Sequence, residues 1–267
     1  MNKQVKLFIV EGEKRDARIL NGLIKCFFQG KYSTKIIELS ASQNIFMLYQ
    51  TLKIDDFETD LVEVLRETVP EAKEKLSGIT RQDISEIYMF FDYDIQQDNI
   101  KRTNSKSDEY SILKEMLSVF NNETENGKLF LSYPMVEAVY DYVDGSCKSF
   151  SGCYVNVENL VNYKEISGNG NPKAGLHFSI TDWKEILNIF ALRLKCLLDL
   201  DKLDFEDYQN NIDPLIILLK EHQIMNERDS VFVLSAFPEF LFEYFKKDFW
   251  NSNTKVQRHI FDSCPKT

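Results

Sequence analysis

The chain has 267 residues, of which 43% are hydrophobic and 28% charged. This composition is typical of a globular protein of one or two domains, and it excludes disordered, collagen-like and disulfide-scaffold chains. The 42 Asp and Glu residues outnumber the 32 Lys and Arg residues, giving a formal net charge of −10. A generally basic nucleic-acid-binding protein is therefore excluded, and any contact with nucleic acid is expected to be local or supplied by a partner.

Targeting and metal-binding signals are sparse in this sequence. Only four apolar residues, at positions 7–10, come between the N-terminal segment and Glu11, too few for a signal-peptide core. No apolar run approaches the roughly 18 to 20 residues of a membrane helix. The five cysteines form no C-x-x-C pair and the three histidines are far apart, so we expect reduced cysteines and no zinc site. We predict a cytoplasmic protein that does not contact a membrane.

The first half of the chain alternates strand patterns with helix patterns. Strands are predicted at residues 5–10, 34–39, 84–91 and 128–132, and helices at residues 14–28, 45–52 and 107–120. Residues 55–83 are charged and predict one or two surface helices, and Pro134 is expected to open a short helix. The continuous apolar run at residues 87–91 is typical of a parallel strand covered on both faces. This alternation over residues 1–142 predicts an α/β domain with a mostly parallel sheet flanked by helices.

The second half has a different pattern. Glycines and a proline between positions 145 and 172 predict a long irregular stretch. Helices are expected at residues 182–198, after the Asp213-Pro214 cap, and over residues 237–250, whereas residues 231–234 fit either a strand or the start of a helix. We therefore predict a mainly helical C-terminal region over residues 143–267 that binds a partner or substrate.

Acidic side chains follow three of the predicted strands. Glu11 comes after the first strand, Asp92 and Asp94 after the third, and Glu137 a few residues after the fourth. Functional groups of an open parallel sheet gather just past the carboxyl ends of its strands. Residues i and i+2 of an extended chain point the same way, so Asp92 and Asp94 are expected to face one site.

Clustered carboxylates repel one another unless a cation neutralises them. Mg²⁺ prefers oxygen ligands and is commonly held by one or two carboxylates together with substrate phosphates. In two-metal sites the ions stabilise the attacking and leaving oxygens of a phosphodiester displacement. We therefore predict that these acids bind one or two Mg²⁺ ions, with Mn²⁺ as an alternative ion.

The order of these motifs resembles a Toprim domain. The chain has a hydrophobic strand ending in Val10-Glu11-Gly12-Glu13 and a later one ending in Asp92-Tyr93-Asp94, within a β/α setting. The resemblance covers about residues 5–140 and, with the segment at 132–137, is closest to nucleases of the OLD and RloB-like groups and to small effectors of bacterial antiphage defence such as that of the PARIS system. It gives no specific interpretation of the C-terminal half.

The resemblance implies roles for individual residues. Glu11 would match the family glutamate, Asp92 and Asp94 the DxD acids, and Glu137 the later acid of the nuclease subgroup, all as catalytic metal ligands; Glu13 is a weaker match. The resemblance further implies hydrolysis of DNA or of RNA such as tRNA, and an associated ATPase or sensor subunit as in similar defence systems. A homo-oligomer is a separate expectation. The resemblance supplies no tyrosine nucleophile, and the assisting lysine stays open among positions 14, 101 and 106.

Two small basic clusters follow the acidic motifs. Lys14, Arg15 and Arg18 follow the first motif, and Lys101, Arg102 and Lys106 follow the second. They are candidate contacts for substrate phosphates at the rim of the acidic site. Solvated surfaces explain such small clusters equally well.

Other functions remain open at this point. A Toprim-like interaction module with weak metal binding would explain the acidic composition and the C-terminal half. A DxD motif also occurs in nucleotide-sugar transferases that use Mn²⁺ and in haloacid-dehalogenase-like phosphatases, although the further motifs of the phosphatases are not found in this sequence. The nuclease hypothesis is the one that uses both acidic motifs in their order.

Overall fold

A computed structural model describes residues 4–12, 14–28, 30–40, 43–93, 108–142, 153–170, 177–200 and 203–246. The chain divides into two compact units. The first comprises Met1–Ala17 and Gly30–Phe130, and the second comprises Arg18–Gln29 and Leu131–Thr267. A functional division into a catalytic region up to residue 142 and a C-terminal region beyond it stays a prediction.

The first unit is built on a five-stranded sheet of order β2-β1-β3-β5-β4. Its strands are β1 (Val5–Val10), β2 (Ser33–Glu38), β3 (Ile84–Asp92), β4 (Asn121–Asn122) and β5 (Gly127–Ser132). β1 pairs in parallel with both β2 and β3, whereas β4 and β5 are antiparallel. All six residues of β1 are buried, Lys6 included, because β1 is an interior strand between β2 and β3. The predicted α/β class with a mostly parallel sheet is confirmed.

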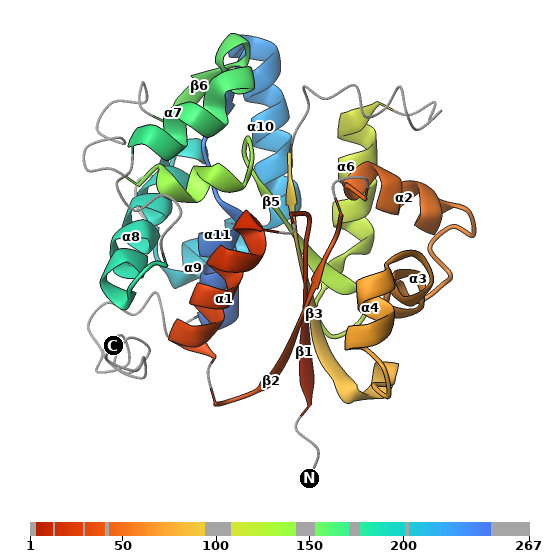
Figure 1. Ribbon diagram of the computed structural model, residues 1–267. Coiled ribbons are helices and arrows are strands. Elements are labelled where there is room, and N and C mark those ends of the chain that lie inside the picture. The colour runs from red at the N-terminus through yellow and green to blue at the C-terminus, as the bar shows by residue number, and fades with distance from the viewer. Residues whose placement is uncertain are drawn as a thin grey trace. The chain divides into compact units, whose positions relative to one another are not determined.

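Four helices of the first unit lie on one side of this sheet, the right-hand side in Figure 1. They are α2 (Ile45–Lys53), α3 (Leu61–Thr68), α4 (Pro70–Lys75) and α6 (Glu109–Val119), and a short 3-10 helix, η1 (Arg81–Asp83), precedes β3. Side-chain oxygens of Asn44, Asp60 and Asp108 cap the N-termini of α2, α3 and α6 by accepting backbone N–H groups. Pro70 occupies the first turn of α4, where its missing N–H costs nothing.

Helix α1 (Arg15–Phe27) follows β1 and continues from the first unit into the second. The further helices of the second unit are η2 (Val136–Tyr140), η3 (Val157–Asn162), α7 (Tyr163–Gly170), α8 (Ile180–Leu197), α9 (Phe205–Asn211), α10 (Pro214–Arg228) and α11 (Ala236–Phe245). Strands β6 (Tyr154–Asn156) and β7 (Ser230–Phe232) form an antiparallel pair. The second unit is mainly helical, as expected, but it contains this additional small sheet.

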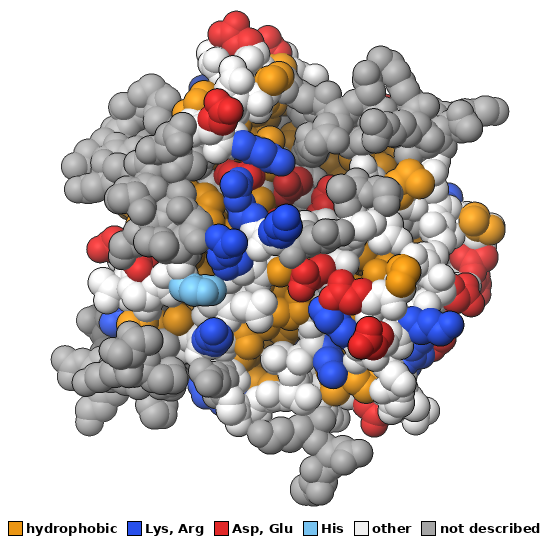
Figure 2. Space-filling model, in the orientation of Figure 1, with side chains coloured by type: hydrophobic (Ala, Val, Ile, Leu, Met, Phe, Trp, Pro, Cys, Tyr) orange, Lys and Arg blue, Asp and Glu red, His pale blue; other side chains and the backbone are white. Residues whose placement is uncertain are grey.

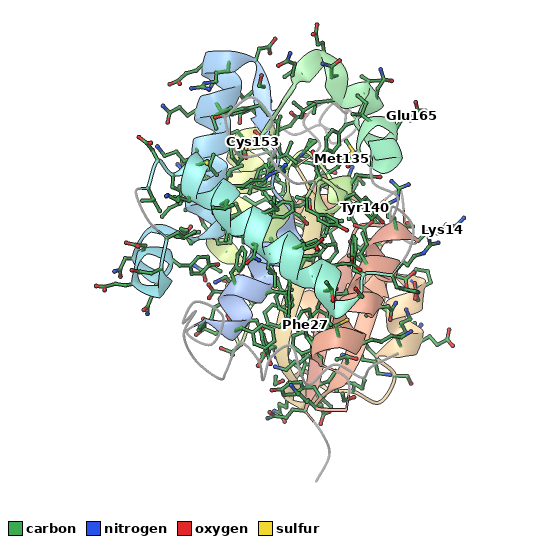
Figure 3. All side chains as sticks on the ribbon, turned by 90° about the vertical axis from the view of Figure 1, so that its left-hand side faces the viewer. Lys14, Phe27, Met135, Tyr140, Cys153 and Glu165 are labelled. Atoms are coloured by element: carbon green, nitrogen blue, oxygen red, sulfur yellow. The ribbon has the colours of Figure 1, made fainter. Side chains whose placement is uncertain are left out.

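Aromatic side chains join α1 to α8 and α11 within the second unit. Phe27 packs edge to face against Trp183, with ring centroids 6.1 Å apart. Phe28 stacks on Phe240 at 5.9 Å. The apolar face of α1 is therefore fixed in the core of this unit, and Figure 3 shows Phe27 beside α8.

Two local expectations were wrong. Residues 153–170, predicted as part of an irregular stretch, form β6, η3 and α7. The short helix after β5 begins at Val136 rather than at Pro134, because Tyr133 pairs with Leu234 in an isolated β-bridge that keeps the backbone there extended. Within the described ranges no helix combines the length and apolarity needed to cross a membrane.

Candidate functional site

Glu11 and Asp92 meet at the carboxyl ends of neighbouring strands in the first unit. The Asp92 backbone N–H donates a hydrogen bond to Glu11 Oε2 at 3.1 Å. The Glu11 backbone N–H in turn donates to the Phe90 carbonyl oxygen at 3.2 Å. Both acids are partly exposed, so the parallel pairing of β1 with β3 brings two carboxylates together where solvent and a ligand can reach them.

Gly12 and Asp16 form the turn that follows Glu11. Asp16 lies in the first turn of α1, and only 7% of it is exposed. A Cβ atom added at Gly12 would lie 3.0 Å from Asp16 Cγ and closer still to Oδ2. A side chain at this position would therefore require the Asp16 carboxylate to move away from the turn.

Asp16 is the acidic residue at this site that the sequence analysis missed. The helix pattern begins at residue 14, and an acid in a first helical turn is ordinarily assigned to the helix dipole. The available signal was its position five residues after Glu11, since a helix that starts directly beyond a glycine turn brings its first turn back to the strand end. Asp16, Glu11 and Asp92 all belong to the first unit.

Lys14 and Arg15 flank the turn at the start of α1. Both side chains are exposed, and Figure 3 shows Lys14 pointing away from the helix. Two exposed cations of the first unit thus follow Glu11 by three and four positions in the sequence. This arrangement is compatible with the expected contact to substrate phosphates, which stays a prediction.

Glu137 lies in η2 of the second unit. Only 1% of this residue is exposed, and its backbone carbonyl accepts a hydrogen bond from Ser167 Oγ at 2.8 Å. Met135 and Ala138 on either side belong to a buried cluster with Tyr163 and Val233. The participation of Glu137 in metal binding stays a prediction.

Four of the predicted site residues, with one weaker candidate, lie outside the described residues. These are Asp94, Lys101 and Arg102 in the segment after Tyr93, Lys106 in the same segment, and Glu13 before α1. Among the residues that are described, no three His, Cys, Asp or Glu side chains come together as a group able to hold a metal ion. No family model, curated protein or solved structure matches this chain in comparisons with known proteins.

Proposed function

We propose that this chain is a metal-dependent nuclease that hydrolyses phosphodiester bonds in DNA or RNA. The observation that carries the proposal is the hydrogen bond between Glu11 Oε2 and the Asp92 N–H. It brings together the two acidic motifs, which are 81 residues apart in the chain. The resemblance to Toprim nucleases supports the same assignment.

The donor set suits a hard divalent cation. Glu11 and Asp92 offer carboxylate oxygens at a partly exposed strand edge, and the buried Asp16 carboxylate lies against the turn between β1 and α1. Mg²⁺ needs only one or two protein carboxylates, because waters and substrate phosphates complete its shell. Glu11 and Asp92 would hold the ion, with Asp94 and Glu137 as the further proposed ligands.

The protein groups have separate roles in this mechanism. Bound Mg²⁺ would supply Lewis-acid stabilisation of the charge that develops on the phosphodiester oxygens. Glu11 and Asp92 fix the reacting centre at the strand ends, and the hydrogen bond from Asp92 N–H orients the Glu11 carboxylate. Lys14 and Arg15, both exposed at the start of α1, bind the neighbouring phosphates.

The test is cleavage of plasmid DNA, single-stranded DNA and total tRNA with Mg²⁺ or Mn²⁺ by four proteins. The first two are wild type and Glu11→Gln, whose amide oxygen can still accept the Asp92 N–H while the charge is lost. Asp92→Asn is the second site variant, and Glu125→Gln is the control because Glu125 is exposed on the β4–β5 turn of the same unit. We expect at least about a 100-fold loss in both site variants, on the scale of losing one group that stabilises transition-state charge.

Two outcomes would overturn the assignment. One is cleavage by the folded Glu11→Gln and Asp92→Asn proteins at the wild-type rate. The other is the absence of cleavage by wild type together with the absence of Mg²⁺ and Mn²⁺ binding in calorimetry. The second result would favour the alternative function, a Toprim-like interaction module that contacts a partner rather than a substrate.

A role in antiphage defence and an associated ATPase or sensor subunit are further parts of this proposal. They rest only on the resemblance. Co-expression of the chain with the proposed ATPase subunit, followed by a phage-plating assay, would test both proposals. The Glu11→Gln protein serves as the inactive control. Equal plating efficiency on cells with wild type and with Glu11→Gln would contradict the defence role.

A further inference from the structure

A cavity of about 140 Å³ lies within the first unit. It is formed by the end of α2, the connection between α2 and α3, the end of α6 and the β4–β5 turn. Within the described part of the chain it shares no lining residue with the Glu11–Asp92 site. Its lining includes the apolar Leu52, Phe57 and Phe120 and the exposed polar residues Glu58, Asp60 and Asn126.

Phe57 forms one wall of this cavity and has a left-handed backbone conformation, with φ at 66°. A bulky residue rarely adopts this conformation, and such strain persists only where surrounding contacts hold it. The Phe57 N–H donates to the Leu52 carbonyl at 2.9 Å, and its ring packs edge to face on Phe120 with centroids 6.2 Å apart. The aromatic wall is therefore preformed, which lowers the ordering cost of binding.

Arg81 ties two other parts of the lining together. Its Nε donates to Asp60 Oδ2 at 3.2 Å, and its Nη2 donates to the Thr124 carbonyl at 3.3 Å. It thus joins the start of α3 to the β4–β5 turn, which also contains Asn126. The Asn126 amide donates to the Val119 carbonyl at 3.4 Å. The polar side of the cavity is therefore also fixed by contacts within the unit.

Glu58 is the acid of this lining whose charge is not compensated. Its side chain is exposed, and it forms no hydrogen bond or ion pair with any of the described residues. Figure 2 shows Asp and Glu side chains at its right-hand edge, where Figure 1 draws the connection between α2 and α3. A cation bound in the cavity would therefore find a carboxylate that needs no internal partner displaced.

The cations of the chain near the cavity are already paired. Arg81 forms an ion pair with Asp60 at 3.2 Å. Lys53, whose Nζ lies 5.3 Å from the Phe57 ring centroid, forms one with Asp56. Within the described ranges neither cation pairs with the remaining acid of the lining.

The volume restricts what the cavity can hold. An apolar cavity of about 150 Å³ accommodates benzene, whereas sites for drug-sized ligands occupy about 300 to 1,000 Å³. The cavity is therefore the size of a single side chain, too small for a nucleotide. Its apolar walls and uncompensated carboxylate suit a cation on an aliphatic stem.

We propose that this cavity binds one arginine side chain of a partner polypeptide, whose guanidinium pairs with the Glu58 carboxylate while its stem packs on Phe57 and Phe120. A guanidinium is planar, pairs with a carboxylate through two hydrogen bonds and stacks on aromatic rings. A basic partner also complements a chain with a formal net charge of −10. The inference does not depend on the proposed nuclease function.

Peptide binding to the full chain tests this inference. Amide NMR spectra would follow titration with a blocked pentapeptide that has arginine between flanking alanines, at about 20 mM salt so that screening is weak. The matched peptide carries citrulline, the neutral isostere of arginine, and a third probe is free butylguanidinium. The proteins are wild type, Glu58→Gln and the control Glu67→Gln, which removes an exposed carboxylate of α3 outside the cavity lining.

We expect saturable shifts of the amides at positions 57–61 and 126 of wild type, with a dissociation constant on the order of 1 mM for the arginine peptide. The citrulline peptide should bind about threefold to fivefold more weakly, on the scale of one exposed ion pair. Glu58→Gln should bind both peptides equally weakly, whereas Glu67→Gln should keep the preference for arginine. Thermal unfolding of each variant confirms that the compared proteins are folded.

Three results would overturn the inference. They are the absence of saturable shifts at these amides, equal affinity of wild type for the arginine and citrulline peptides, and an arginine preference that survives in Glu58→Gln. Butylguanidinium that binds as tightly as the arginine peptide would overturn the assignment to a polypeptide partner. Because no probe contains a phosphodiester, these outcomes are separate from those of the cleavage assay.

Discussion

Glu221 of α10 is a buried acid whose replacement should make stability less sensitive to pH. Only 1% of the residue is exposed. Its Oε2 accepts the backbone N–H of Phe232 at 3.0 Å, and Oε1 has no hydrogen-bond partner among the described residues. Burial raises the pKa of this carboxyl well above its usual range, and the Phe232 N–H offsets only part of that rise.

The sign of the pH effect follows from proton binding. In the unfolded chain a glutamate ionises near a pKa of about 4.3. Above that pH the unfolded state has lost the proton that the folded state keeps, so the free energy of unfolding falls as pH rises. The loss is about 1.4 kcal/mol per pH unit until the raised folded pKa is reached.

The substitution Glu221→Gln removes this dependence while an amide oxygen still accepts the Phe232 N–H. The free energy of unfolding of the variant minus that of wild type should therefore increase by about 1.4 kcal/mol per pH unit between those two pKa values. Burying the amide NH₂ without an acceptor costs about 1 to 3 kcal/mol. That cost is independent of pH and does not alter the slope.

Urea unfolding at pH 5, 6, 7 and 8 measures the difference, because groups that titrate equally in both proteins cancel. The control is Glu185→Gln, which removes an exposed carboxylate of α8. Its difference from wild type should stay flat across the same range. A flat difference for Glu221→Gln, or one that falls as pH rises, would refute the assignment of a buried acid with a raised pKa.

Three further substitutions test other contacts. Gly12→Ala should lower the free energy of unfolding by about 1 to 3 kcal/mol, because the added Cβ would collide with the Asp16 carboxylate. An unchanged urea midpoint would show that the turn has room for the added methyl group. Ser179→Ala removes the side chain that caps α8, so the free energy of unfolding should fall by about 1 kcal/mol, and thermal unfolding at the wild-type temperature would contradict the cap. Arg193→Met removes the 2.9 Å hydrogen bond to the Val233 carbonyl in the second unit; chemical unfolding should show a loss of about 1 to 3 kcal/mol, and equal stability would mean that this carbonyl is satisfied otherwise.

Strong local periodicity made the central elements of the first unit predictable from the sequence. The apolar strand at residues 5–10 and the apolar run at residues 87–91 correspond to β1 and to the interior of β3. The Asp213-Pro214 pair begins α10 as expected, since a capping side chain and a first-turn proline act on the adjacent backbone. Elements of this kind are determined by residues within one or two turns of each other.

Very short strands, and pairings between distant segments, could not be predicted from the sequence in the same way. The sequence pattern left residues 231–234 open between a strand and a helix start, and it did not indicate β6, because strands of three residues are too short to show an alternating pattern. The pairing of β6 with β7 joins segments that are far apart in the chain. The bridge between Tyr133 and Leu234 arises in the same manner. Such pairings depend on where the whole chain brings two backbones together.

The candidate site shows the same division between local and tertiary information. The sequence by itself determined the chemical character of Glu11 and Asp92 and their positions after apolar strands, because strand and turn patterns are local. Only the tertiary structure decided that β1 lies beside β3, that the Glu11 carboxylate accepts the Asp92 N–H and that the Asp16 carboxylate packs on Gly12. The physical reason is that contacts between side chains on different strands depend on strand order and register. Burial of the whole core determines that order and register, and the residues adjacent in the sequence do not.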